Sequence, residues 1–246
     1  MSTVAAPSAS AWTEEGIYQR MVQTIRNQQL HPGTKLGEDR LASAFGVSRT
    51  RIRPVLVRLA SEQVVTLTPN RGATVAVPTE QEAREVFQVR RLIEPTLVAG
   101  FMARASGAEF QTLGHCITQE ESARTQGERH RAIRLAGEFH LHIAQFSQHH
   151  TLSRIMGELV SRTSLVLMAY GQPTDLGHGP ASSACGCQDH RALMDAMRLG
   201  DRSLAEQLMQ NHLYSLEAQL RFAPAPAPAP DLLSLFQTAH ATAAAD

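Results

Sequence analysis

The sequence lacks the features of membrane proteins and of secreted, disulfide-stabilised proteins. No apolar run approaches the roughly 18–20 residues that a membrane-spanning helix needs. The segment Met1–Ala11 is small and polar and has neither the basic nor the apolar region of a secretory signal. Three cysteines, Cys116, Cys185 and Cys187, are too few for a disulfide framework. We therefore expect a cytoplasmic protein without a membrane partner.

The sequence also has no net charge, but its charges are unevenly distributed. Residues 1–78 contain nine Lys/Arg and five Asp/Glu, a balance of +4, whereas residues 79–246 contain 14 and 18, a balance of −4. Of the 11 histidines, only His31 lies in the first part. This segregation indicates a basic module that binds a polyanion, followed by a module of another kind.

The first part has the pattern of a winged helix-turn-helix, which we place at about residues 10–78. Apolar periodicity predicts helices over Ile17–Gln29, Glu38–Phe45 and Arg49–Glu62. Gly46 can adopt the left-handed conformation that ends a helix, and Ser48 can cap the next one. Two strands, Val64–Thr68 and Ala73–Val77, would then form a hairpin wing with Arg71 and Gly72 at its tip.

The second helix of such a motif enters the major groove of DNA with its N-terminal residues. Here those residues are basic or carry hydroxyl groups, namely Ser48, Arg49, Thr50, Arg51 and Arg53. Arginine can bond two guanine acceptors at once, and hydroxyl groups can hold phosphates. An exposed arginine face can also be inert, but its combination with a glycine turn and a basic wing favours binding to double-stranded DNA.

These residues resemble the DNA-binding domain of the GntR superfamily. The resemblance extends over about 60 residues, through Pro32–Glu38, Leu41-Ala42, Phe45–Thr50, Arg53 and Arg71–Val75. It implies DNA contacts from Ser48, Arg49, Arg53 and Gly72. The family usually has proline at the position of Arg51 and glutamate at that of Pro54. It often has a basic residue at the position of Asp39, and we count the neighbouring Arg40, like Arg71 of the wing, among the expected DNA contacts. Pro54 removes one backbone hydrogen bond and should bend the helix.

The second part, residues 79–222, is predicted to be an all-α bundle, so that the fold as a whole is mainly α. We expect about six helices, over 80–105, 108–124, 128–147, 151–170, 188–199 and 202–222. Gly171–Gly186 is expected to be a long loop. Residues 223–246 begin with an Ala-Pro repeat, which predicts a stiff spacer followed by a frayed tail.

Histidine spacing suggests a metal site inside this bundle. Gly200 and Asp201 predict a turn between two antiparallel helices, with Asp201 capping the second. His190 and His212 lie ten and 11 residues from that turn, roughly 15–17 Å along each helix, and should be side by side. His140 lies on a third amphipathic helix. Three converging imidazoles can hold a divalent metal, although a single bundle histidine is more often a packing residue.

The second part resembles the FadR-type C-terminal domain, or FCD domain, over about residues 80–220. The resemblance rests on Arg90–Glu94, Phe139-His140, Asp189–Leu193 and Asn211–Leu213. It implies a helical bundle that binds small carboxylates and, in many members, a metal held by His140, His190 and His212. The family's fourth ligand is an aspartate at the position of Ala136; Cys187 is a candidate substitute. The resemblance also places Arg90 in the effector cavity.

We therefore predict a metabolite-responsive transcription regulator, acting as a repressor. A homodimer would bind a palindromic operator, and a small carboxylate in the bundle, near Arg90 and a zinc or nickel ion, would change its affinity for DNA. One alternative is a regulator that senses the metal directly. Another is a metal-dependent hydrolase, for which Glu138 and Asp189 are the candidate general bases. We do not expect an enzyme, because neither carboxylate has a compelling position.

Overall fold

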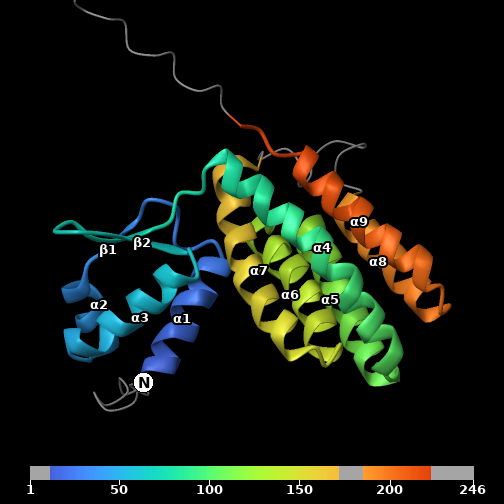
Figure 1. Cartoon of the computed structure of the whole chain (residues 1–246), viewed down its shortest axis with the longest axis horizontal. Coiled ribbons are helices and arrows are strands. Elements are labelled where there is room, and N and C mark those ends of the chain that lie inside the picture. The colour runs from blue at the N-terminus through green and yellow to red at the C-terminus, as the bar shows by residue number, and fades with distance from the viewer. Residues whose placement is uncertain (1–11, 172–184, 223–246) are drawn as a thin grey trace, which may run out of the picture.

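The computed structural model describes residues 12–171 and 185–222. Figure 1 shows two parts, a small domain of helices α1–α3 with a three-stranded sheet and a bundle of helices α4–α9. Each part has its own cluster of buried apolar side chains. The architecture therefore has the two predicted components, and its fold class, mainly α with a winged helix-turn-helix, is confirmed.

The small domain begins with helix α1 and continues through the two helices of the helix-turn-helix. These are α1 (Glu14–Arg26), α2 (Glu38–Phe45) and α3 (Arg49–Ser61). Gly46 ends α2 with a left-handed φ of 64°, as its lack of a side chain allows. Ile52, Val55 and Leu59 of α3 are buried against α1, whereas the intervening arginines stay exposed.

The wing is an antiparallel hairpin of β2 (Val65–Thr68) and β3 (Gly72–Val75). A third strand that the sequence analysis missed, β1 (Lys35–Leu36), pairs with the other edge of β3, so that the sheet order is β1-β3-β2. Ser48 stands at the N-cap position of α3, but its side chain makes no capping hydrogen bond. The prediction that the Ser48 side chain caps α3 is therefore wrong. Its hydroxyl forms a hydrogen bond with the Thr50 hydroxyl instead, at 2.7 Å.

The bundle has six helices in the described ranges, which agrees with the number expected. They are α4 (Glu80–Arg104), α5 (Gly107–Thr125), α6 (Arg129–Phe146), α7 (His150–Tyr170), α8 (Cys185–Arg198) and α9 (Arg202–Ala218). The turn between α8 and α9 forms as predicted, since Gly200 has a φ of 77° and the Asp201 carboxylate accepts a hydrogen bond from the Leu204 amide at 3.0 Å.

Two predicted boundaries in the bundle are wrong. Helix α8 begins at Cys185, inside the segment expected to be a loop, and α9 ends at Ala218 rather than at residue 222. The remainder of the expected loop, residues 172–184, and the Ala-Pro repeat with its tail, residues 223–246, lie outside the described residues.

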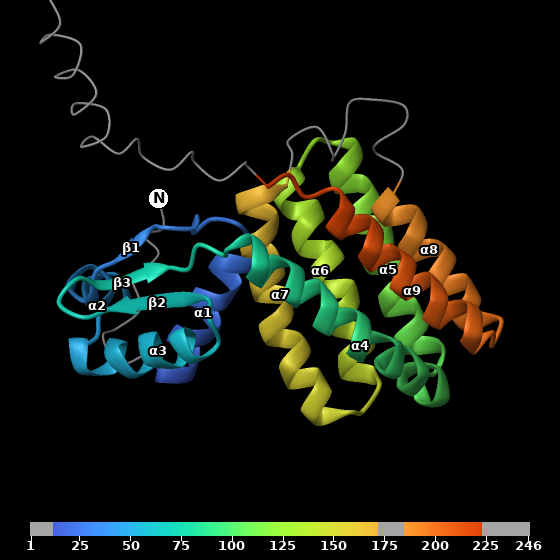
Figure 2. The same cartoon turned by 45° about the horizontal axis from the view of Figure 1, so that its top comes forward.

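Helix α7 joins the two parts, because α1 packs against it in both views (Figures 1 and 2). Leu165 of α7 is fully buried within the apolar cluster of the small domain. Arg26 of α1 donates hydrogen bonds to the Gly157 carbonyl at 2.6 Å and to the Ser161 hydroxyl at 2.9 Å. The small domain is therefore attached to the bundle mainly along one face of α7.

Candidate functional site

The exposed side of α3 carries the polar residues that the sequence analysis assigned to DNA. Arg49, Thr50, Arg51 and Arg53 follow Ser48 along the first turns of the helix and are exposed. Arg40 is exposed on α2. The structure thus places these side chains on the surface of the helix-turn-helix, where a duplex can reach them.

Two arginines of α3 are held by carboxylates of α2. Arg53 bonds Glu38 through two nitrogens at 3.0 and 3.1 Å, and Arg49 pairs with Asp39. Both pairs are exposed, and exposed pairs contribute little to stability. A phosphate can therefore replace the carboxylate as the partner of each guanidinium at small cost. Arg51 is turned elsewhere, since it donates a hydrogen bond to the Trp12 carbonyl at 3.1 Å.

The wing presents Arg71 and Gly72 at its exposed tip. The turn is closed by a hydrogen bond from the Arg71 amide to the Thr68 carbonyl at 3.0 Å. Gly72 has a φ of 81°, which L side chains rarely adopt, and no atom lies within 4 Å of where a Cβ would stand. The glycine is needed for the turn rather than for space, and it leaves a bare backbone for close approach to DNA.

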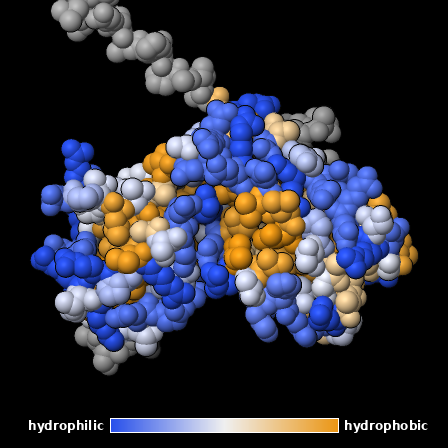
Figure 3. Space-filling model, viewed as in Figure 1, coloured by the Kyte–Doolittle hydropathy of each residue, from blue (hydrophilic) through white to orange (hydrophobic). Residues whose placement is uncertain are grey.

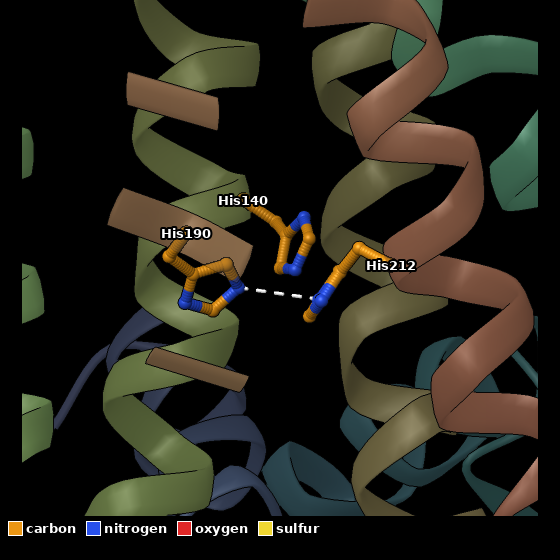
Figure 4. A group of neighbouring side chains, drawn as sticks. All are labelled: His140, His190 and His212. Carbon is orange, nitrogen blue, oxygen red and sulfur yellow. Dashed lines mark hydrogen bonds between the residues drawn. The ribbon is translucent and has the colours of Figure 1, made fainter. Parts of the chain in front are cut away.

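Three buried histidines meet inside the bundle, as Figure 4 shows. His140 on α6, His190 on α8 and His212 on α9 are each at most 3% exposed. Their ring nitrogens that could bind a metal all lie within 4.8 Å of one another, and the Nε2 atoms of His190 and His212 are 3.2 Å apart. The predicted meeting of these residues is confirmed; their role as ligands stays a prediction.

Each histidine also meets a carboxylate through Nδ1. The Nδ1 of His140 lies 2.6 Å from Glu94, that of His190 lies 2.8 Å from Glu120, and that of His212 lies 3.1 Å from Asp189. An ionised carboxylate only accepts hydrogen bonds, so Nδ1 is the nitrogen that carries the proton. Nε2 of each ring is therefore the atom left for a metal, in the arrangement typical of metal-binding histidines.

Burial and charge shift the pKa values of His140, His212 and Glu94. Burial lowers the pKa of His140 to about 3 and that of His212 to about 4, so both rings are neutral near pH 7. Burial opposes ionisation of Glu94, but the neighbouring Arg90 and His140 outweigh it and lower the pKa of its carboxyl group to about 2. Neutral imidazoles with ionised carboxylates behind them are the state that binds a divalent metal.

The three rings fit a metal ion. Because Nδ1 of both His190 and His212 donates to a carboxylate, a hydrogen bond between their Nε2 atoms needs an additional proton. A metal cation between the two Nε2 atoms would take the place of that proton, because both atoms could donate a lone pair to it. Cys187 does not complete the set: within the described ranges the ligand group contains only the three histidines, and burial raises the pKa of the Cys187 thiol to about 12. Ala136, at the family's aspartate position, lines the adjoining cavity.

That cavity has a volume of about 70 Å³, which exceeds the space that one water molecule requires. It is lined by the three histidines, by apolar side chains and by three arginines, Arg90, Arg124 and Arg129. Arg90 is 2% exposed and donates to Glu94 at 2.6 Å and to the Thr163 hydroxyl at 3.4 Å. A cavity of this size, with cationic and neutral donors on apolar walls, is suited to a small anion.

The carboxylates behind the histidines were not predicted from the sequence. Glu94 follows Arg90 by four residues and Glu120 precedes Arg124 by four, and each pair forms a salt bridge within its helix. A spacing of four residues between opposite charges predicts such a salt bridge on a helix, so both pairs could have been predicted from the sequence. It did not reveal which histidine each carboxylate meets, because the partners are 46 and 70 residues apart. Arg129 was also missed.

A winged helix-turn-helix joined to a helical bundle is the architecture of a transcription regulator. The chain belongs to the GntR family of bacterial regulatory proteins, which it matches over residues 13–75, and its second domain is an FCD domain, matched over residues 85–215. It is a DNA-binding transcription regulator of this family and not an enzyme, so the hydrolase alternative is excluded.

Similar proteins share one or both domains. A transcriptional regulator of the Streptomyces ambofaciens unstable DNA locus is 27% identical over 80% of each chain. The Nta operon regulator of Aminobacter aminovorans is 28% identical over 60% of this chain and 70% of its own. The gluconate operon repressor of Bacillus licheniformis is 41% identical over 34% of this chain and 33% of its own.

Solved structures show the same fold. McbR/YncC of E. coli superposes with a TM-score of 0.72 at 20% identity and covers 87% of this chain and 99% of its own. A GntR-type protein from Rhodococcus sp. RHA1 superposes with a TM-score of 0.71 at 22% identity. It covers 84% of this chain and 96% of its own. Within residues 12–171 and 185–222, no helix has the length and apolarity that crossing a membrane requires.

We predict that Arg53→Ala weakens DNA binding about tenfold or more and lowers the slope of log affinity against log salt by about one. The variant removes one cation and leaves Glu38 without its partner beside the phosphates. Fluorescence anisotropy with DNA from upstream of the gene, over a salt series, measures both effects. Arg104→Ala, an exposed arginine at the far end of α4, is the control and should behave like the wild type. An unchanged salt slope in Arg53→Ala would place this guanidinium away from the duplex.

Proposed function

We propose that this regulator is a repressor that responds to a small carboxylate bound in the cavity of its FCD domain. The proposal rests chiefly on one observation: the buried histidines and Arg90 line the same cavity on apolar walls. A gluconate operon repressor that is 41% identical over 34% of this chain supports the proposal that the regulator represses transcription. Binding of the carboxylate would change the affinity for operator DNA.

Arg90 is the residue that we propose to bind the effector. Its Nε and Nη1 atoms are engaged by Glu94 and Thr163, whereas its buried Nη2 has no hydrogen-bond partner. A buried guanidinium nitrogen without a partner is unfavourable, and a carboxylate oxygen would satisfy it. The effector would thereby gain a charge-assisted hydrogen bond in a site largely shielded from water.

A divalent metal, zinc or nickel, would be held by His140, His190 and His212. The ion would supply a positive charge to which a carboxylate oxygen can bind. The protein's part is to keep three neutral imidazoles in place through Glu94, Glu120 and Asp189. Because Ala136 brings no carboxylate, the chain itself supplies only three ligands, and positions remain for the effector or for water.

Helix α7 connects the cavity to the DNA-binding domain. Val160, Thr163 and Leu167 line the cavity. Gly157, Ser161 and Leu165, on another face of the same helix, contact the small domain. A ligand that shifts α7 would therefore shift the docking surface of α1, which changes the pose of the recognition helix.

We also propose that the regulator is a homodimer that binds a palindromic operator. Figure 3 shows an apolar patch where α4 and α7 reach the surface of the bundle. Leu92 of α4 is 70% exposed, and Val89 on the same helix is 37% exposed. A second copy would cover this face, and the two-fold symmetry of the pair would set the two half-sites of the operator.

Direct metal sensing is a second candidate. A site with three protein ligands would exchange its ion more readily than one with four, so that the ion could itself be the signal. The two functions differ in one result: a metal sensor changes its DNA affinity when zinc alone is added, whereas a carboxylate sensor also needs the carboxylate.

The homodimer is tested by Leu92→Glu. A carboxylate at the centre of an apolar interface should weaken dimerisation about tenfold or more, since the charge would be buried without a partner. Sedimentation velocity over a concentration series measures this. Leu199→Glu, an exposed leucine at the α8–α9 turn, is the control. Equal dimerisation by wild type and Leu92→Glu would assign the interface to another surface.

The metal site is tested by Asp189→Asn. The side chain keeps its shape and can still accept a hydrogen bond from His212, but it loses its charge. We predict about tenfold weaker zinc binding, measured by competition with a chelating indicator. Asp195→Asn, an exposed aspartate on the same helix, should bind zinc like the wild type. If His212→Ala bound zinc as tightly as the wild type, the three histidines would not be the site.

The regulatory function is tested with DNA from upstream of the gene and a panel of small carboxylates, with and without zinc. We expect tighter binding to this DNA than to random DNA, and weaker binding when a carboxylate of the panel is present. Equal affinity for both DNAs would contradict operator recognition.

In the same assay, Arg26→Gln should reduce the effect of the carboxylate on DNA affinity while leaving carboxylate binding itself intact. The reason is that Arg26 links α1 to α7 without lining the cavity. Arg20→Gln, an exposed arginine on the same helix, is the control and should retain the full response. An Arg26→Gln variant with an unchanged response would show that α7 does not transmit the signal through this contact.

A further inference from the structure

Two of the arginines that line the cavity, not one, have a buried guanidinium nitrogen without a hydrogen-bond partner. Among the described residues, three buried side-chain nitrogen or oxygen atoms have no hydrogen-bond partner, namely Gln28 Nε2, Arg90 Nη2 and Arg129 Nε. Arg90 and Arg129 both line the cavity of the FCD domain. Buried polar groups are nearly always paired, so two exceptions in one cavity point to a ligand with acceptors for both.

The charges of the cavity lead to the same conclusion. Arg90 is balanced by Glu94, and Arg124 is balanced by Glu120. Arg129 forms no salt bridge with any residue of the ranges 12–171 and 185–222. The one hydrogen bond of its side chain there runs from Nη2 to the Gly171 carbonyl, at a long 3.3 Å. Among the three arginines that line the cavity, Arg129 is therefore the one that has no carboxylate partner in the described ranges.

The two arginines are anchored at different heights of α7. Arg90 bonds Thr163 and Arg129 bonds Gly171, eight residues further along the chain. At 1.5 Å per residue these anchors are roughly 12 Å apart along the helix axis. Val160 and Leu167 of α7 and Leu216 of α9 line the cavity beside them. Two cationic points with apolar side chains alongside match an anion that has a charge at each end and methylene groups between.

We propose that Arg129 forms a second anion subsite and that the effector of this regulator is a short dicarboxylate. One carboxylate binds at Arg90 and the histidine site, and the other binds at Arg129. The inference rests on the proposed function, since it specifies the class of carboxylate that enters the same cavity.

The test compares dicarboxylates with monocarboxylates of equal chain length on the full-length protein with zinc. Succinate is paired with butyrate, and glutarate with valerate, and their affinities are measured by isothermal titration calorimetry. We expect the better dicarboxylate to bind the wild type at least about tenfold more tightly than its partner, because it alone reaches both arginines.

Arg129→Gln should remove this preference by weakening the dicarboxylate to the level of its partner while leaving monocarboxylate affinity and zinc affinity unchanged. Arg131→Gln is the matched control, because it removes an equal charge from the same end of α6, where Arg131 is exposed and pairs with Glu128. The control should keep the preference. Thermal unfolding without ligand checks that both variants fold.

Two results would overturn the inference. One is equal binding of the paired compounds by the wild type, which needs no variant and leaves the proposed function intact. The other is a folded Arg129→Gln variant that keeps the preference. If neither kind of carboxylate bound the wild type with or without zinc, the proposed function itself would fail together with the inference.

Discussion

The hydrogen bond between an imidazole Nδ1 and a carboxylate of another helix is the interaction around which the FCD domain is organised. It occurs three times, between α6 and α4, α8 and α5, and α9 and α8. Each pair satisfies a buried imidazole, and in the first two pairs also a buried carboxylate, that would otherwise destabilise an apolar core. The same bonds fix the tautomer of each ring and turn its Nε2 towards the other two. Packing and the proposed metal binding therefore depend on the same contacts. Arg90 and Arg124 extend these contacts by pairing with Glu94 and Glu120.

Helix α7 contacts both the cavity and the DNA-binding domain. Thr163 bonds Arg90 in the cavity, and Ser161, two residues earlier, accepts a hydrogen bond from Arg26 of α1. A second link lies at the start of α6, where Arg129 lines the cavity and its neighbour His130 bonds Gln28 of the small domain at 2.8 Å. In both places a residue that touches the cavity stands beside one that touches the DNA-binding domain. In the proposed mechanism, a ligand would need to displace either helix only slightly to change the docking of α1, because packed elements move as rigid bodies.

The sequence predicted those parts of the molecule that depend on local signals. Gly46 and Asp201 mark turns whose geometry is set within a few residues, and the helix spacing around Gly200 was sufficient to bring His190 beside His212. The carboxylates were out of reach, because the contact between Glu120 and His190 joins residues 70 positions apart and depends on how helices pack. Arg129 gave no signal either, since an arginine at the start of a helix is ordinarily exposed. Only the folded chain shows that Arg129 lines the cavity and that its buried Nε has no hydrogen-bond partner.

The central claim is that the cavity and the recognition helix are coupled. Coupling is reciprocal: if a carboxylate weakens DNA binding by some factor, DNA must weaken carboxylate binding by the same factor. The most direct test is therefore to titrate succinate into the zinc-loaded protein with and without saturating DNA from upstream of the gene. The account predicts that this DNA lowers the succinate affinity by the factor by which succinate lowers the DNA affinity. A succinate affinity that is the same in both titrations would contradict it.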